Sequence, residues 1–167
     1  VNKYYQINST GTGGTSSTSG GGAANIWNGT TPTASVFSIG THNRVNTNGQ
    51  SYSAFLFATA PGVSKVGYYT GSSGTIDVDC GFSNGAKFIL IKLVSHSGYG
   101  WYVFDSRRGI VSGNDPHIRI NESTGSEVTS TDAIDPLSSG FQVTVPANAG
   151  TGINQNGYVY LFYAVAA

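Results

Sequence analysis

The stretch from Trp101 to Gly109 carries the most distinctive reactive side chains, because Asp105 and the pair Arg107-Arg108 directly follow an aromatic run. A carboxylate and a guanidinium at one place can hold a carboxylate or a sugar through charge-assisted hydrogen bonds. The same two groups can instead fasten the end of a strand to its loop. We favour the second interpretation and predict that Asp105 and Arg107 form a structural pair.

The other acids and the imidazoles form no pattern typical of catalysis or metal binding. Asp77 and Asp79 lie two residues apart and share a strand face, as in a paired-carboxylate or calcium site, but a solvated strand face explains them without a ligand. His42, His96 and His117 are far apart, and the chain has no nucleophile-elbow signature. The sequence therefore predicts no catalytic residue, no cofactor and no metal site.

Aromatic side chains are the remaining candidates for ligand contact, since flat rings stack on sugars and nearby polar groups grip hydroxyls. Tyr99 lies in a Ser-Gly-Tyr-Gly turn and is the residue we most expect to be exposed, with Trp27 and Tyr69 as further candidates for glycan or receptor contact. The alternative is that such rings fill a core. For Trp101 and Tyr52, which lie in strand-like sequence, we favour the core.

Charge is scarce and balanced. Only 10% of the residues are charged, and eight basic residues balance eight acidic ones. Without a net field or a basic stripe, phosphate backbones and anionic lipids are not attracted, so nucleic acid and membranes are excluded as partners. A neutral, hydroxyl-rich surface promotes association, so we expect a homo-oligomer or a fixed assembly with other proteins.

A single cysteine, Cys80, excludes an internal disulfide and a structural zinc site, which takes about four ligands. No run approaches the roughly 20 apolar residues of a membrane helix. The sequence starts at Val1 without a basic and apolar leader, so we expect no targeting segment and interpret the chain as a processed product or a fragment.

Strand patterns dominate, and helical periodicity is nearly absent. Residues 76–80 alternate apolar and acidic side chains, which predicts a strand with one face in water. Residues 88–94 are apolar on both faces, as in a central, covered strand. Further strands are expected at residues 101–104, 117–120, 141–145 and 158–163. Many short strands separated by turn residues predict an all-β fold, an antiparallel β-sandwich or jelly roll.

Two parts of the sequence resemble each other, which favours an internal repeat. Residues 31–39 match residues 135–143, with proline over proline and phenylalanine over phenylalanine, and both read as a proline turn that enters a strand. Residues 48–55 match residues 156–163, where an Asn-Gly turn precedes an aromatic strand.

The repeat predicts two domains. Residues 1–60 would be a partial repeat, the last strands of a β unit with a Gly/Ser/Thr-rich loop at residues 11–22. Residues 61–167 would be a complete β-sandwich repeat. The partial repeat would have to borrow a sheet edge from its neighbour, from another chain or from an upstream segment. The alternative is one domain in which both sets of strands share a core.

An ordered series of short motifs carries a resemblance to a known family. The motifs are Tyr68-Tyr69-Thr70-Gly71, Gly81-Phe82, the Trp101 to Gly109 stretch, Ile118-Arg119-Ile120-Asn121 and Asn156-Gly157 with its aromatic strand. Together they resemble a repeated β domain of uncharacterised function found in tail, tail-fibre and appendage proteins of bacteriophages, notably marine cyanophages. The resemblance implies an oligomeric virion component that serves host attachment or appendage architecture, and it supplies no catalytic residues.

Three functions are therefore open. The first is a non-enzymatic module of a phage tail fibre or other virion appendage, with other virion proteins and host-surface glycans as partners. The second is a carbohydrate-binding module, either free or part of a glycan-degrading enzyme. The third is a polysaccharide depolymerase, which would rest on Asp105, Asp115 and Glu122 as acids. The sequence favours the first.

Overall fold

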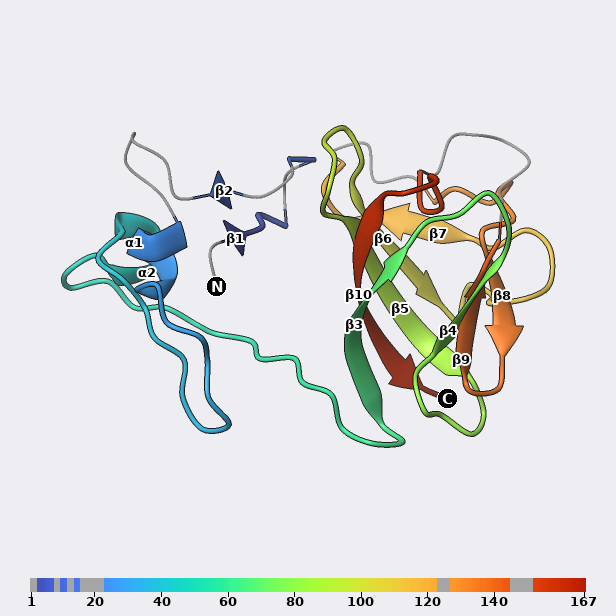
Figure 1. Ribbon diagram of the computed structural model, residues 1–167, viewed down its shortest axis with the longest axis horizontal. Coiled ribbons are helices and arrows are strands. Elements are labelled where there is room, and N and C mark those ends of the chain that lie inside the picture. The colour runs from blue at the N-terminus through green and yellow to red at the C-terminus, as the bar shows by residue number, and fades with distance from the viewer. Residues whose placement is uncertain (1–2, 8–9, 12–13, 16–22, 123–126, 145–151) are drawn as a thin grey trace. The chain divides into compact units, whose positions relative to one another are not determined.

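The computed structural model describes residues 3–7, 10–11, 14–15, 23–122, 127–144 and 152–167, which fall into two units (Figure 1). The N-terminal unit comprises Val1–Gln6 and Gly11–Leu56, and the sandwich unit comprises Ile7–Thr10 and Phe57–Ala167. Strand pairs are antiparallel throughout the described residues, and the helices there have only five and four residues. The predicted all-β class is confirmed.

The N-terminal unit begins with a minimal sheet and a single helical turn. β1 (Lys3–Tyr4) pairs with β2 (Gly14–Thr15) in antiparallel register. α1 (Ala23–Trp27) is followed by Asn28 and Gly29, whose φ angles are 53° and 60°. Residues in this left-handed region end a helix, so the Asn-Gly pair stops α1 after little more than one turn.

α2 (Asn43–Asn46) is also defined by local hydrogen bonds. His42 is its N-cap, and its Nδ1 accepts a hydrogen bond from the backbone N–H of Arg44 at 3.0 Å. A cap of this kind satisfies one of the free donors at a helix start. Helices this short show no hydrophobic periodicity, which is why the sequence pattern did not predict them.

The larger sheet of the sandwich unit has five strands in the order β3-β10-β5-β6-β7. These strands are β3 (Ser64–Thr70), β10 (Val159–Ala166), β5 (Ala86–Leu93), β6 (Trp101–Asp105) and β7 (His117–Arg119). The C-terminal strand β10 is thus inserted between β3 and β5, and β5 lies in the middle of the sheet. The central position predicted for residues 88–94 is confirmed, but the cover on both faces is not: Ile89 and Ile91 are fully buried, whereas Phe88 and Leu90, which point to the other face, are only half-buried.

The smaller sheet has the order β4-β9-β8, formed by β4 (Ile76–Asp79), β9 (Gly140–Val143) and β8 (Ile134–Leu137). Along β4, Val78 is buried while the two acidic residues, Asp77 and Asp79, are exposed. The alternation predicted for this strand, with one face in the core and one in water, is confirmed.

Pro136 corrects one local prediction. It does not form a turn before a strand but lies inside β8, where it pairs with Phe141 of β9. β8 is an edge strand, and proline is tolerated there because it need not donate to a second neighbour. The turn follows at Ser138 and Ser139, between β8 and β9.

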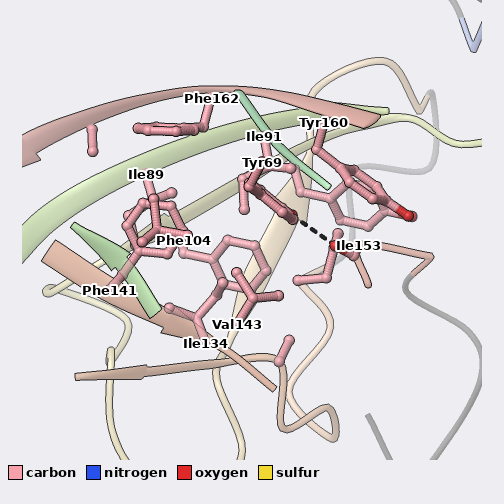
Figure 2. Close-up of a cluster of buried hydrophobic side chains, with 14 of the residues drawn as sticks. Tyr69, Ile89, Ile91, Phe104, Ile134, Phe141, Val143, Ile153, Tyr160 and Phe162 are labelled. Atoms are coloured by element: carbon pink, nitrogen blue, oxygen red, sulfur yellow. Dashed lines mark hydrogen bonds between the residues drawn. The ribbon is translucent and has the colours of Figure 1, made fainter. Parts of the chain in front are cut away.

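The core lies between the two sheets (Figure 2). Phe162 of the larger sheet meets Phe141 of the smaller one edge to face, with ring centroids 5.4 Å apart. Tyr69 stacks on Tyr160 with centroids 4.9 Å apart, and its hydroxyl donates a hydrogen bond to the carbonyl oxygen of Ile153 at 2.7 Å. Each fully buried apolar side chain contributes about 1.5–3 kcal/mol, so this interdigitated layer stabilises the sandwich.

The structure does not confirm the internal repeat. Residues 31–39 and 48–55 contain no strand, whereas their counterparts 135–143 and 156–163 contribute to the β8–β9 hairpin and to β10. Most of the predicted loop at residues 11–22 lies outside the described residues.

Candidate functional site

The turn after β6 is organised by the carboxylate of Asp105. Its Oδ1 accepts hydrogen bonds from the backbone N–H groups of Arg107 and Arg108, both at 3.0 Å. Its Oδ2 pairs with the guanidinium of Arg108. The predicted pairing is therefore corrected in one respect: Arg107 contributes only its backbone, and its exposed side chain does not form the ion pair.

Arg108 is held from a second side as well. Its Nε lies 3.0 Å from Oε1 of Glu127, so one guanidinium serves two carboxylates. A cation neutralised in this way has little capacity left for an incoming carboxylate or sugar. Asp105 thus holds the end of β6 to the turn that follows it.

Asp115 is fully buried, and its carboxylate is used entirely within the fold. Oδ1 accepts from the backbone N–H of Val111 at 3.1 Å, and Oδ2 accepts from those of Ala133 and Ile134 at 3.0 Å and 2.8 Å. Burial raises the pKa of Asp115, and these three hydrogen bonds to the ionised form oppose that rise. The group ties its own loop, at Val111, to the start of β8, at Ala133 and Ile134, and it is buried away from any substrate.

His117, on β7, is also fully buried, against the rings of Phe104 and Tyr102 at centroid distances of 5.0 Å and 5.7 Å. Its Nδ1 lies 3.3 Å from the carbonyl oxygen of Asp115, which can only accept, so Nδ1 carries the proton. Nε2 has no hydrogen-bond partner among the described residues. Burial lowers the pKa of His117, because the imidazolium would lose its hydration there.

We expect this histidine to make stability depend on pH. Below about pH 6.5 His117 binds a proton in the unfolded chain but not in the folded chain. The free energy of unfolding therefore falls by up to about 1.4 kcal/mol for each pH unit of acidification. Urea unfolding between about pH 7.5 and about pH 5 should show a shallower pH slope for His117→Gln than for the wild type.

Exposed His96 provides the comparison, and the change of slope should be larger for His117→Gln than for His96→Gln. The buried carboxyl of Asp115 acts in the opposite sense, since its raised pKa lets the folded state bind its proton first, but it does so in all three proteins. Equal slopes for the wild type and His117→Gln would contradict the prediction.

The three aromatic candidates for ligand contact differ in how far their rings are exposed. Tyr69 is 7% exposed and belongs to the core, so its predicted contact with a glycan is wrong. Tyr99 is half-buried, with its ring against Gly152, and Trp27 is half-buried at the end of α1. Tyr52, expected in the core, is instead 50% exposed.

The exposed carboxylates of β4 have local partners. Asp77 Oδ1 accepts from the side-chain amide of Gln142 at 2.7 Å, and Asp79 Oδ1 accepts from the backbone N–H of Gly81 at 2.8 Å. Glu122 pairs with Arg119 at 2.8 Å. Across the part of the chain that the structure describes, no three His, Cys, Asp or Glu side chains gather as metal ligands.

The surface feature that sequence reasoning missed is the outer face of the larger sheet, the face turned away from the smaller sheet. Alternation along β10 places Tyr160, Phe162 and Ala164 in the core, and the residues between them on the outer face. Strand register puts equally apolar residues beside them. The outer-face residues are Val66, Tyr68, Phe88, Leu90, Val103, Ile118, Leu161, Tyr163 and Val165.

The outer face is unusual because the solvent side of an antiparallel sheet is normally polar. Lys92 also points to this side, but it is fully buried, and its Nζ donates to the carbonyl oxygen of Tyr99 at 2.7 Å. Phe57 lies on the face, with its ring 4.8 Å from that of Tyr163. Tyr68 remains 65% exposed and Phe57 60% exposed. The signal in the sequence was the run of apolar residues on both faces of β10 and β5.

No helix within the described ranges is long and apolar enough to cross a membrane. No curated protein and no solved structure matches the chain. One family, described as a domain of unknown function (DUF7483), matches residues 2–167 and so includes both units. Because this match covers nearly the whole sequence, the protein belongs to the DUF7483 family.

Proposed function

We propose that the chain is a non-enzymatic structural module of a bacteriophage tail fibre or other virion appendage, which assembles with further copies or other virion proteins and contacts the host surface. The observation that carries the proposal is the apolar outer face of the larger sheet, of which Tyr68 and Phe57 remain largely in water. Exposed contiguous apolar surface marks a site of association.

Two further observations support an assembling protein. The formal net charge is zero, so copies do not repel one another at close approach. The acids and the histidine that could have served catalysis have structural roles. Asp105 accepts hydrogen bonds within a turn, Asp115 accepts buried backbone hydrogen bonds, and His117 is packed in the core. The motif series that resembles phage appendage domains supports a virion as the place of this assembly.

The test is the native mass and shape of the purified chain, measured by light scattering and negative-stain microscopy. We expect a closed oligomer or a filament. A particle that stays at the 17.3 kDa of one chain at high micromolar concentration contradicts the proposal.

Carbohydrate binding is the alternative, and Tyr99 and Trp27 are the remaining candidates for it. Both rings are half-buried, so each could offer only part of a stacking surface. Binding of the purified chain on a glycan array, lost in Tyr99→Ala, would favour this alternative. Array binding by an oligomeric form would be consistent with host attachment.

A further inference from the structure

The 52–60 segment, from Tyr52 to Ala60, is apolar and belongs to no named strand, although all of its residues are described. Its three central side chains are among the most exposed apolar groups of the chain: Phe55 is 86% exposed, Leu56 75% and Phe57 60%. Three consecutive large apolar residues in water favour a partner that removes them from it.

The segment has the sequence of a strand that the fold already uses. Residues 52–60 read Tyr-Ser-Ala-Phe-Leu-Phe-Ala-Thr-Ala, and residues 158–166 read Tyr-Val-Tyr-Leu-Phe-Tyr-Ala-Val-Ala. The first, seventh and ninth positions are identical, and large apolar residues fill the fourth to sixth positions of both. The second sequence is β10 with the residue before it, and β10 pairs with β3 along one of its edges. A segment of this composition is therefore suited to pair with β3.

β3 has a free edge. The backbone N–H of Val66 donates to the hydroxyl of Thr59 at 3.1 Å, so Val66 directs its backbone groups away from β10. Because direction alternates along a strand, Tyr68 and Thr70 direct theirs to the same side. Among the described residues no strand pairs with β3 there, and Tyr68 is 65% exposed. An edge of this kind accepts an added strand.

The chain does not fill this edge itself. Ala60 forms a bridge with Ser64, and Thr59 bonds to Val66, so the preceding residues start along β3. No strand is assigned to residues 52–59, and the ring of Phe57 lies against Tyr163 on the outer face. At Tyr68 and Thr70, in the C-terminal half of β3, no described strand pairs with this edge.

We propose that the 52–60 segment of one copy adds as an antiparallel strand to the free edge of β3 in a second copy and extends the five-stranded sheet across the interface. A second copy is the occupant because the segment matches the strand that β3 accepts on its other edge. Neither the segment nor Tyr68 and Thr70 carry charge, so the two surfaces suit each other. The inference rests on the proposed assembly function and identifies its interface.

The geometry allows two forms of assembly. The donor segment and the acceptor edge are different surfaces of one chain, so reciprocal addition gives a closed dimer, whereas one-way addition gives a ring or a filament. A one-way arrangement would suit a fibre.

Two substitutions should reduce the assembly to monomers. Phe55→Ser removes an apolar group of the segment, and Thr70→Pro removes an N–H that faces the free edge while leaving the ladder between β3 and β10 intact. Val36→Ser is the matched control, because Val36 is also apolar and is 62% exposed but lies outside the segment. Light scattering should give the 17.3 kDa mass for the first two variants and the wild-type mass for the control.

Cross-linking keeps the test decisive if Thr70→Pro fails to fold. Chains with Leu56→Cys are mixed with differently tagged chains with Tyr68→Cys, and Cys80 stays in place because it is buried. A thiol cross-linker should join the two kinds of chain into mixed dimers. Mixed dimers no more frequent than in a mixture that pairs Val36→Cys with Tyr68→Cys would overturn the inference.

The two proposals fail in different ways. If the wild type is oligomeric and Phe55→Ser keeps its mass, the segment is not the interface and the assembly function stands. If the wild type is monomeric, both proposals fall.

Discussion

Replacing Asp115 by alanine should destabilise the sandwich unit by about 4 kcal/mol, because it leaves buried backbone donors without acceptors at about 1–3 kcal/mol each. The carboxylate accepts from Val111, Ala133 and Ile134, and Ala133 and Ile134 are themselves fully buried. Water cannot reach the N–H groups of Ala133 and Ile134 to replace the lost bonds, whereas Val111 is 47% exposed. The free energy of unfolding from urea titration measures the loss.

Asp115→Asn separates the hydrogen bonds from the charge. One amide oxygen can still accept from Ala133 and Ile134, but the amide NH2 then meets the N–H of Val111, so we expect a smaller loss of about 1–2 kcal/mol. Asp77→Ala, at an exposed carboxylate with one side-chain partner, should change stability by less than about 0.5 kcal/mol. Equal losses of unfolding free energy for Asp115→Ala and Asp77→Ala would show that the buried hydrogen bonds of Asp115 do not stabilise the fold.

The strands were predictable wherever burial alone determined the pattern. β4 showed the period of two because one face is in water, and the apolar run of β5 marked it as a central strand, although Phe88 and Leu90 on its outer face are only half-buried. The N-terminal unit was not predictable in this way. Its helices depend on His42 and on the Asn28-Gly29 pair, which are local capping effects with no periodic signature.

The same limit applied to the candidate site. Asp115 follows a turn-like Ser-Gly-Asn run, and sequence alone could not separate an exposed acid from a carboxylate that binds backbone N–H groups 18 and 19 residues away. Tyr69 was a candidate for glycan contact because its ring could stack on a sugar, yet alternation along β3 directs it into the core and Tyr68 outward. A one-residue difference in phase decides which tyrosine is available to a partner.

Residues 48–55 match residues 156–163, and in a register shifted by two residues the 52–60 segment matches residues 158–166; the first of these similarities led to an unconfirmed conclusion. The similarity was interpreted as a second copy of the last strands, but residues 48–55 form no strand in the described structure. A segment with a strand-like sequence becomes a strand only where a neighbouring strand offers it a free edge. The similarity is therefore more informative about which edge the segment can bind than about the fold of the chain that contains it.

Replacing Gly140 by alanine should cost about 3 kcal/mol or more, because a Cβ there would collide with the backbone of β4. The ideal Cβ falls on the carbonyl oxygen of Val78, well inside van der Waals contact, and 3.2 Å from Sγ of Cys80. Gly140 opposes Asp79 in the ladder between β4 and β9 and Leu137 in the ladder between β8 and β9, so the smaller sheet must part to relieve the collision.

The control for this substitution is Gly74→Ala. Gly74 has no positive φ, and a Cβ there meets nothing within 4 Å. We expect thermal unfolding to show a large fall in Tm for Gly140→Ala and almost none for Gly74→Ala. Similar Tm values for both variants would mean that the close approach of β4 and β9 is not required for stability.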